Sequence, residues 1–149
     1  IAVVIDKSTY TRELVLASGM LALNLPCAAL ADVTYTVGSL SGRDDGADKF
    51  ERFGIDTTDG PALGLPLVVG CVAWMECQVL REPHTEAAYD TFFVEVVSAQ
   101  ADARVFANGR WSFGDDNAAL HTLHHLGAGA FARAGAVVQG KLLEALPKN

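Results

Sequence analysis

The stretch from Leu67 to Leu80 reads LVVGCVAWMECQVL and is the most hydrophobic part of the chain. A run with so many apolar residues and so little charge is typical of buried strands. The glycine inside it, Gly70, predicts a bulge or a tight bend, so the run forms one long strand or two. A second β-rich run, TFFVEVVSA from Thr91 to Ala99, follows the polar connection Arg81 to Ala88. These two runs indicate that a sheet forms the centre of the fold.

Shorter elements are expected on either side of these two runs. A helix signal near Ala28 is weakened by the β-branched and aromatic residues from Val33 to Thr36. The other elements predicted are strands at Ile1–Ile5 and Met20–Leu25, a hairpin from Val105–Phe106 to Gly109–Trp111, short helices at Leu14–Leu16 (ended by Gly19) and from the N-cap Asp48 to Phe53 (ended by Gly54), a loop at Asp56–Gly64, and a C-terminal helix at Val137–Leu146. Many short strands and few helices predict a mainly β protein, a β-barrel with peripheral helices, in which residues 1–149 form one domain.

Composition limits the classes of partner. The net charge is −7, with eleven basic residues scattered among eighteen acidic ones, which argues against nucleic-acid binding. No apolar run approaches the length of a membrane span, and no signal peptide is visible, so a cytoplasmic protein is expected. The three cysteines have no paired spacing and are expected to be reduced and buried. Half of the residues are hydrophobic, which suggests additional surface buried in a homodimer.

The first candidate site is Lys7-Ser8-Thr9-Tyr10-Thr11, which lies between a predicted buried strand and the start of a helix. Hydroxyls, an ammonium group and free backbone N–H groups at a helix start form a natural cradle for an anion. The alternative is that the Ser and Thr side chains only cap the helix, and the residues alone favour this alternative.

The second candidate site combines Ser41-Gly42-Arg43 with Asp48-Lys49-Phe50. Gly42 would let the backbone approach a ligand, while Arg43 and Lys49 could bind a phosphate. The alternative is a solvated loop in which Asp44, Asp45 and Asp48 neutralise the two basic side chains. The residues alone again favour the alternative.

The order of these motifs resembles the flavin-reductase-like family. The resemblance rests on Lys7–Thr11, Leu23-Asn24, Ser41–Phe50, the AWMEC segment Ala73–Cys77 and the strand Asp90–Val97, and extends less clearly through Trp111 and Leu123–Gly127. It implies an FMN-binding split barrel that works as a homodimer and holds FMN, or FAD, near the subunit interface. The side chains it places beside the flavin phosphate are Lys7, Ser8, Thr9, Thr11, Arg43 and Lys49, with Asn24 and the Ser41-Gly42 backbone near the ribityl chain and ring.

The resemblance also implies a reaction. A reduced nicotinamide, NADH or NADPH, would pass hydride to the flavin, which requires no catalytic acid or nucleophile from the protein. We accordingly predict an NAD(P)H-dependent flavin reductase, the small component of a two-component monooxygenase system. The alternative is a non-catalytic FMN-binding protein that carries electrons or stores flavin.

Three departures from the family pattern bear on this prediction. The interval between Arg43 and Asp48 is about two residues longer than usual, because of Asp45-Gly46-Ala47. Tyr89 stands where the family often has a His near the nicotinamide, and Tyr does not protonate near neutral pH. The chain begins at Ile1 without the upstream strand and TA-type segment of the family, so the N-terminal part of the barrel is expected to be incomplete.

Other polar residues receive a structural interpretation. His121 and His125 would share a helical face, but no Cys, Asp or Glu spacing accompanies them, so no metal site is predicted. Glu76 and Glu95 lie inside apolar strands, where alternation predicts that they point outward or pair with an Arg.

Overall fold

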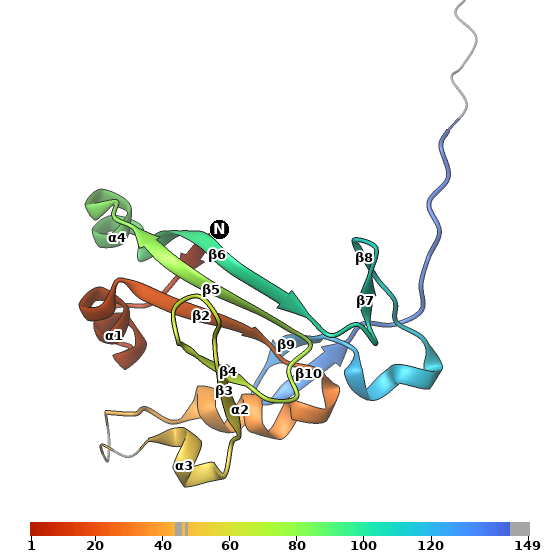
Figure 1. The fold of residues 1–149 in the computed structure, drawn as a ribbon, viewed down its shortest axis with the longest axis horizontal. Helices are drawn as coiled ribbons and strands as arrows, with labels where there is room; N and C mark the ends of the chain where they lie inside the picture. The colour runs from red at the N-terminus through yellow and green to blue at the C-terminus, as the bar shows by residue number, and fades with distance from the viewer. Residues whose placement is uncertain (44–45, 47, 144–149) are drawn as a thin grey trace, which may run out of the picture.

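The computed structural model describes residues 1–43, 46 and 48–143 (Figure 1). Its strands are β1 (Ala2–Val4), β2 (Met20–Leu25), β3 (Thr57–Asp59), β4 (Pro66–Val68), β5 (Ala73–Leu80), β6 (Thr91–Ala101), β7 (Phe106–Ala107), β8 (Arg110–Trp111), β9 (Leu123–Gly127) and β10 (Ala130–Arg133). Its helices are α1 (Tyr10–Ser18), α2 (Ala31–Ser39), α3 (Lys49–Phe53) and α4 (Pro83–Tyr89), with 3₁₀ turns η1 (Ala28–Leu30) and η2 (Asp115–Leu120). The expectation of a mainly β fold with peripheral helices is confirmed.

A four-stranded antiparallel sheet in the order β1-β6-β5-β2 forms the half-barrel at the centre of the fold. The second part of the run Leu67–Leu80 and the run Thr91–Ala99 lie in it, because β5 and β6 are its two middle strands. The run Leu67–Leu80 is divided into β4 and β5 by a turn at Gly70, whose φ of +90° suits glycine. Hairpins β3–β4, β7–β8 and β9–β10 complete the β structure.

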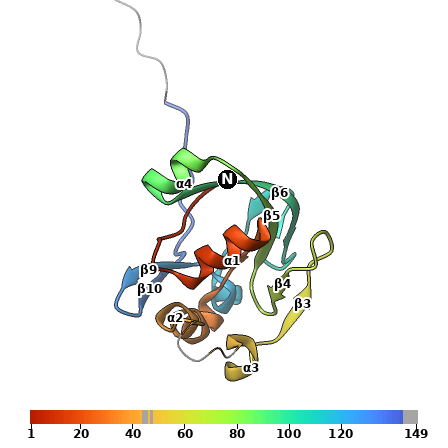
Figure 2. The same ribbon diagram turned by 90° about the vertical axis from the view of Figure 1, so that its left-hand side faces the viewer.

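Two clusters of buried side chains hold these elements together. Ile5, Val15 and Phe92 pack where α1 covers the sheet, next to the paired strands β1 and β6. The second cluster, built on Cys27, Val72 and Val105, joins the far end of the sheet to the C-terminal region. Figure 2 shows α1 lying above α2 and α3, with the β3–β4 hairpin beside them.

Local signals set the ends of α1 and α3 as expected. The Thr9 hydroxyl accepts a hydrogen bond from the Arg12 N–H at the start of α1, and Gly19 ends this helix with a φ of 70°. Asp48 caps α3 in the same way and Gly54 ends it, as predicted. α2 forms despite its β-branched residues and follows η1 directly, and the Thr34 hydroxyl donates to the Leu30 carbonyl.

Several expectations for secondary structure were wrong. Residues Val137 to Leu143 form no helix and leave the body as an exposed tail (Figure 1), and Glu144–Leu146 of that predicted helix lie outside the described residues. Gly140 and two adjacent valines give this segment low helix propensity, and its described apolar side chains are exposed. The connection Arg81–Ala88 contains α4, and the loop Asp56–Gly64 contains β3. His121 and His125 share no helix, because His125 lies on β9.

No helix among the described residues is long and apolar enough to cross a membrane.

Candidate functional site

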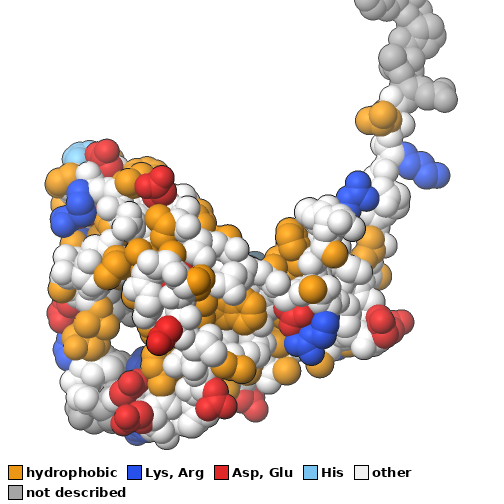
Figure 3. Space-filling model, viewed as in Figure 1, with side chains coloured by type: hydrophobic (Ala, Val, Ile, Leu, Met, Phe, Trp, Pro, Cys, Tyr) orange, Lys and Arg blue, Asp and Glu red, His pale blue; other side chains and the backbone are white. Residues whose placement is uncertain are grey.

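A cavity of about 950 Å³ opens between α1, α2 and α3. Figure 3 shows the corresponding hollow on the left of the molecule, between the region of α1 and that of α3. Polar lining comes from residues 8–11 at the start of α1, from Ser39, Ser41 and Gly42 at and just after the end of α2, and from Asp48 and Lys49. Apolar lining comes from Leu14, Val33, Val37, Leu40, Phe50, Ile55 and Val68. An apolar cavity of this size with polar groups at one side has the character of a small-molecule site.

The polar side of the cavity is the N-terminus of α1. The first N–H groups of a helix have no partner inside it, so those of Tyr10 and Thr11 are available to a ligand in the cavity. Thr9 is less available, because its hydroxyl donates to the Asp6 carbonyl at 2.8 Å and accepts from Arg12. The start of α1 therefore offers backbone N–H groups and the Thr11 hydroxyl to an anion.

Ser8 lies at the same place but is already bonded to Asp6. The backbone N–H and the hydroxyl of Ser8 both donate to one Asp6 carboxylate oxygen, at 2.7 Å and 2.6 Å. These two bonds from Ser8 hold the pKa of Asp6 below its ordinary value. An anion bound at α1 would therefore lie near an existing negative charge.

Lys49 supplies the positive charge of the cavity. Its ammonium donates to the Val37 carbonyl at 2.6 Å and to the Leu40 carbonyl, at the C-terminal end of α2. An ammonium has three N–H donors, and contacts with the described residues use two of them, which leaves one for a ligand. Lys49 thus stabilises the end of α2 and lines the cavity at the same time.

Asn24 of β2 and Val68 of β4 also line the cavity. The Asn24 amide oxygen accepts from the Val68 N–H at 2.8 Å, and the Trp74 indole N–H donates to the Val68 carbonyl at 2.9 Å. Both bonds join β4 to the central sheet. Asn24 is thus a structural link as well as a lining residue, and its amide oxygen is already used.

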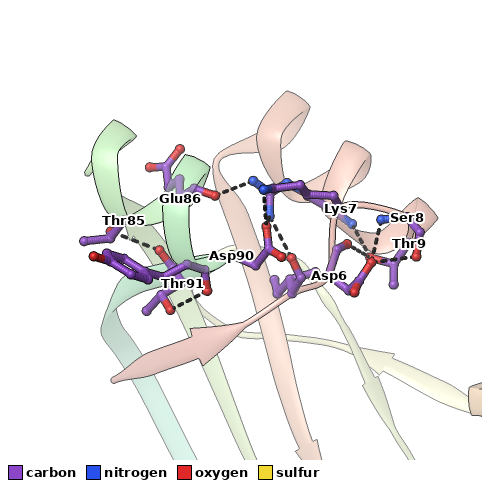
Figure 4. Close-up of polar contacts among 11 residues, drawn as sticks. Asp6, Lys7, Ser8, Thr9, Thr85, Glu86, Asp90 and Thr91 are labelled. Carbon is purple, nitrogen blue, oxygen red and sulfur yellow. Dashed lines mark hydrogen bonds and ion pairs between the residues drawn. The ribbon is translucent and has the colours of Figure 1, made fainter.

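Two predicted phosphate ligands, Lys7 and Arg43, are not among the residues that line the cavity. Lys7 lies 3.7 Å from the Asp90 carboxylate, which also accepts from Arg12 at 2.9 Å (Figure 4). Arg43 donates to Glu13 at 2.5 Å and to the Ser8 carbonyl at 3.2 Å. The structure thus uses Lys7 and Arg43 to join segments of the chain, and neither side chain lines the cavity.

The other seven predicted residues do line the cavity: Ser8, Thr9, Thr11, Asn24, Ser41, Gly42 and Lys49. Their role as flavin ligands stays a prediction. The longer loop before Lys49 includes Asp44, Asp45 and Ala47, which lie outside the described residues. The apolar wall from α2 was not predicted, although the spacing of Val33 and Val37 places both on one helix face.

The prediction for Glu76 was wrong, whereas Glu95 is exposed as expected. Only 1% of Glu76 is exposed, and its carboxylate accepts backbone N–H groups of Ala62 and Leu63 rather than pairing with an Arg. His121 is also buried, with its ring nitrogens 2.7 Å from the Ala134 carbonyl and 2.9 Å from the Gly114 carbonyl. Within the described part of the chain, no three His, Cys, Asp or Glu side chains gather closely enough to hold a metal ion.

The half-barrel and the cavity beside α1 define the class to which this chain belongs. The model of the flavin reductase like domain matches residues 1–124, and the chain is a member of that family. The motifs from Lys7 to Trp111 that suggested this family lie within the matched region, and the segment Leu123–Gly127 extends past its end.

Individual proteins agree with this assignment. The chain is 53% identical over 136 residues to uncharacterized protein YddH of Escherichia coli K12, covering 91% of this chain and 70% of YddH. A solved FMN-binding domain of a flavin reductases-like enzyme from Shewanella baltica is 36% identical, with a TM-score of 0.89 over 94% of this chain and 73% of that one. Flavoredoxin of Desulfovibrio vulgaris shares the fold, with a TM-score of 0.76, 18% identity, and coverage of 93% of this chain and 72% of its own. These likenesses establish the split-barrel fold.

Proposed function

We propose that this protein binds FMN in the cavity between α1, α2 and α3 and reduces it with NAD(P)H. The observation that carries the proposal is the combination in one cavity of unpaired N–H groups at the start of α1, the Lys49 ammonium and an apolar wall. Its volume of about 950 Å³ lies within the range of small-molecule sites. The FMN-binding relative from Shewanella baltica supports the choice of FMN over FAD.

In this proposal each side of the cavity holds a different part of the flavin. The N–H groups of Tyr10 and Thr11, the Thr11 hydroxyl and the free N–H of Lys49 would bind the phosphate. The apolar side chains of α2 and β4 would contact the ring and exclude water from it. When bound, the flavin supplies hydride acceptance from a nicotinamide, so the chain itself contributes position and electrostatics rather than an acid or nucleophile.

A second candidate function is an FMN-binding protein that carries electrons or stores flavin without NAD(P)H turnover. Tyr89 favours this candidate. Its ring is 65% exposed on α4, contacts His84 at 5.8 Å between ring centroids, and lies outside the cavity lining. It therefore gives the cavity of its own chain no stacking ring.

We also propose that the protein is a cytoplasmic homodimer whose reduced flavin passes to a partner monooxygenase. Apolar side chains lie exposed on one face of the central sheet, where Leu80 of β5 pairs with Phe93 of β6 and Val4 lies on the neighbouring β1. A second copy would cover this face. The three cysteines are free and buried, which suits a reducing compartment.

A steady-state assay of NADH and NADPH oxidation with added FMN tests the reductase proposal. Turnover that saturates with FMN and scales with protein concentration is the expected result. Tight FMN binding without turnover under either nicotinamide would replace it with the electron-carrier function.

A further inference from the structure

The buried carboxylate of Glu76 lies outside the flavin cavity and has no part in the function proposed above. Glu76 lies in the middle of β5 and is 1% exposed. One carboxylate oxygen accepts from the Leu63 N–H at 2.7 Å and the other from the Ala62 N–H at 3.0 Å. Burial raises the pKa of Glu76, but the N–H donors of Ala62, Leu63 and Leu65 and the Ser98 hydroxyl outweigh burial and hold the pKa below its ordinary value.

The backbone N–H donors to Glu76 come from the turn that joins β3 to β4. This turn, residues 60–65, we call the Glu76 loop. Hydrogen bonds from Gly60 N–H to the Leu65 carbonyl at 2.8 Å and from Gly64 N–H to the Gly60 carbonyl at 3.0 Å close the loop. A Cβ atom on Gly60 would lie 2.2 Å from a Glu76 carboxylate oxygen. The loop therefore wraps the carboxylate so closely that only glycine fits at position 60 without a shift.

The chemistry of the loop specifies a carboxylate. The loop presents N–H donors to both oxygens, and a carboxylate accepts at both. A glutamine would accept at one oxygen and turn an NH₂ group toward the remaining N–H donors, leaving a buried pair of donors without an acceptor.

The Glu76 loop is continuous with one wall of the cavity. It leads directly into β4, whose Val68 lines the cavity and bonds to Asn24 and Trp74. On the other side of the hairpin, Asp56 follows the lining residue Ile55, and its carbonyl accepts from the Val69 N–H at 2.9 Å. The position of the hairpin on the sheet is thus set at one end by Asn24 and Trp74 and at the other by Glu76.

We propose that Glu76 is a positioning residue of the flavin site, which fixes the β3–β4 hairpin and through it the Ile55–Val68 wall against the flavin ring. The proposal rests on the function proposed above. Glu76 acts on the side of the cavity that contacts the flavin ring, not on the phosphate side at α1. Loss of Glu76 therefore weakens binding of any flavin ring, with or without a phosphate.

The test compares affinities for FMN and riboflavin, measured by quenching of flavin fluorescence at neutral pH. The variants are Glu76→Gln and Gly60→Ala, with Glu95→Gln on the adjacent strand as the matched exposed control, and each is first shown to be folded by circular dichroism. Both test variants are expected to raise the Kd for FMN and the Kd for riboflavin by the same factor, roughly tenfold. This is the low end of the effect seen when hydrogen-bond partners of metal ligands are removed. Glu95→Gln leaves both Kd values unchanged.

A lowered melting temperature with unchanged Kd values in Glu76→Gln and Gly60→Ala would show that Glu76 stabilises the fold only, and would overturn the positioning role. A loss of FMN affinity without loss of riboflavin affinity would also overturn it. If Glu76→Gln and Gly60→Ala fail to fold, the test uses Ser98→Ala, which removes one donor to the same carboxylate. A two- to threefold rise in both Kd values then supports the positioning role, and no rise overturns it. A wild-type protein that binds neither flavin would instead refute the proposed function, and this inference with it.

Discussion

The Glu76 loop and the start of α1 are both cradles of backbone N–H groups, but they are filled differently. In the Glu76 loop a carboxylate of the protein itself accepts the N–H groups, and the group is buried. At the start of α1 the Asp6 carboxylate accepts from Ser8, and Tyr10 and Thr11, whose N–H groups have no partner within the helix, line the cavity. The comparison shows how one backbone device serves two purposes. In the Glu76 loop, which we call the closed cradle, an internal carboxylate accepts the N–H groups and fixes the structure. At the start of α1, which we call the open cradle, the N–H groups would bind the anion of a ligand.

The largest expected effect is on the closed cradle. Gly60→Ala forces a Cβ against the Glu76 carboxylate and is expected to lower the free energy of unfolding by about 2–3 kcal/mol, measured by urea denaturation. Gly38→Ala in α2 is the control, because a Cβ there meets nothing within 4 Å. The control is expected to raise stability by about 0.5 kcal/mol. Equal stability of both variants would contradict the close wrapping of Glu76.

The next effect concerns the open cradle. Lys49→Ala is expected to weaken FMN binding by roughly 10- to 100-fold, because a charge-assisted phosphate contact is lost. Riboflavin binding should hardly change. Lys7→Ala is the matched control, since Lys7 lies beside Asp90 rather than in the cavity. If Lys7→Ala weakened FMN binding as much as Lys49→Ala, the placement of the phosphate would be wrong.

A smaller effect of opposite sign is expected at Asp6. Asp6→Asn keeps an acceptor for Ser8 but removes a negative charge next to the proposed phosphate position. FMN affinity is expected to rise roughly two- to fivefold at low salt, and less at high salt because exposed charges are screened. Titrations at two ionic strengths check this, and an unchanged or lowered affinity would argue against an anion at α1.

The smallest expected effect concerns how the stability contributed by Glu76 depends on pH. The folded-state pKa of Glu76 is depressed, so its contribution to stability is present above the ordinary pKa of 4.5 and is lost as pH falls through the folded value. The stability difference between wild type and Glu76→Gln should therefore be constant near neutral pH and narrow below about pH 4.5. Denaturation curves at a series of pH values measure this, and a difference that widens on acidification would contradict the assignment.

Local signals in the sequence were sufficient for much of the fold. Helix caps at Asp48 and Gly54 and the β-rich runs of β5 and β6 depend on neighbouring residues alone, and they lie as predicted. β9 and β10 were missed because Gly127, Ala128 and Gly129 gave no recognised hairpin signal. The helix predicted from Val137 was wrong because the described apolar side chains of this segment are exposed, so a helix there gains no packing energy.

The site was predictable where a motif is contiguous. Residues 8–11 and Lys49 reach the cavity because the helix start and the cap place them there. Lys7 and Arg43 could not be separated from them by sequence, since their partners Asp90 and Glu13 are defined only by folding. The error at Glu76 has the same origin, because the donors that satisfy its carboxylate are backbone groups of a distant turn.

The central claim is that the cavity beside α1 binds FMN through an open anion cradle. The most direct measurement is a titration of the purified wild-type protein with FMN and, separately, with riboflavin, followed by flavin fluorescence and by the absorbance of flavin retained after removal of the unbound fraction. The account predicts saturable binding of both, with FMN bound roughly 10- to 100-fold more tightly, the difference that a charge-assisted phosphate contact supplies. Equal affinities for the two flavins, or no retained flavin and no quenching, would contradict it.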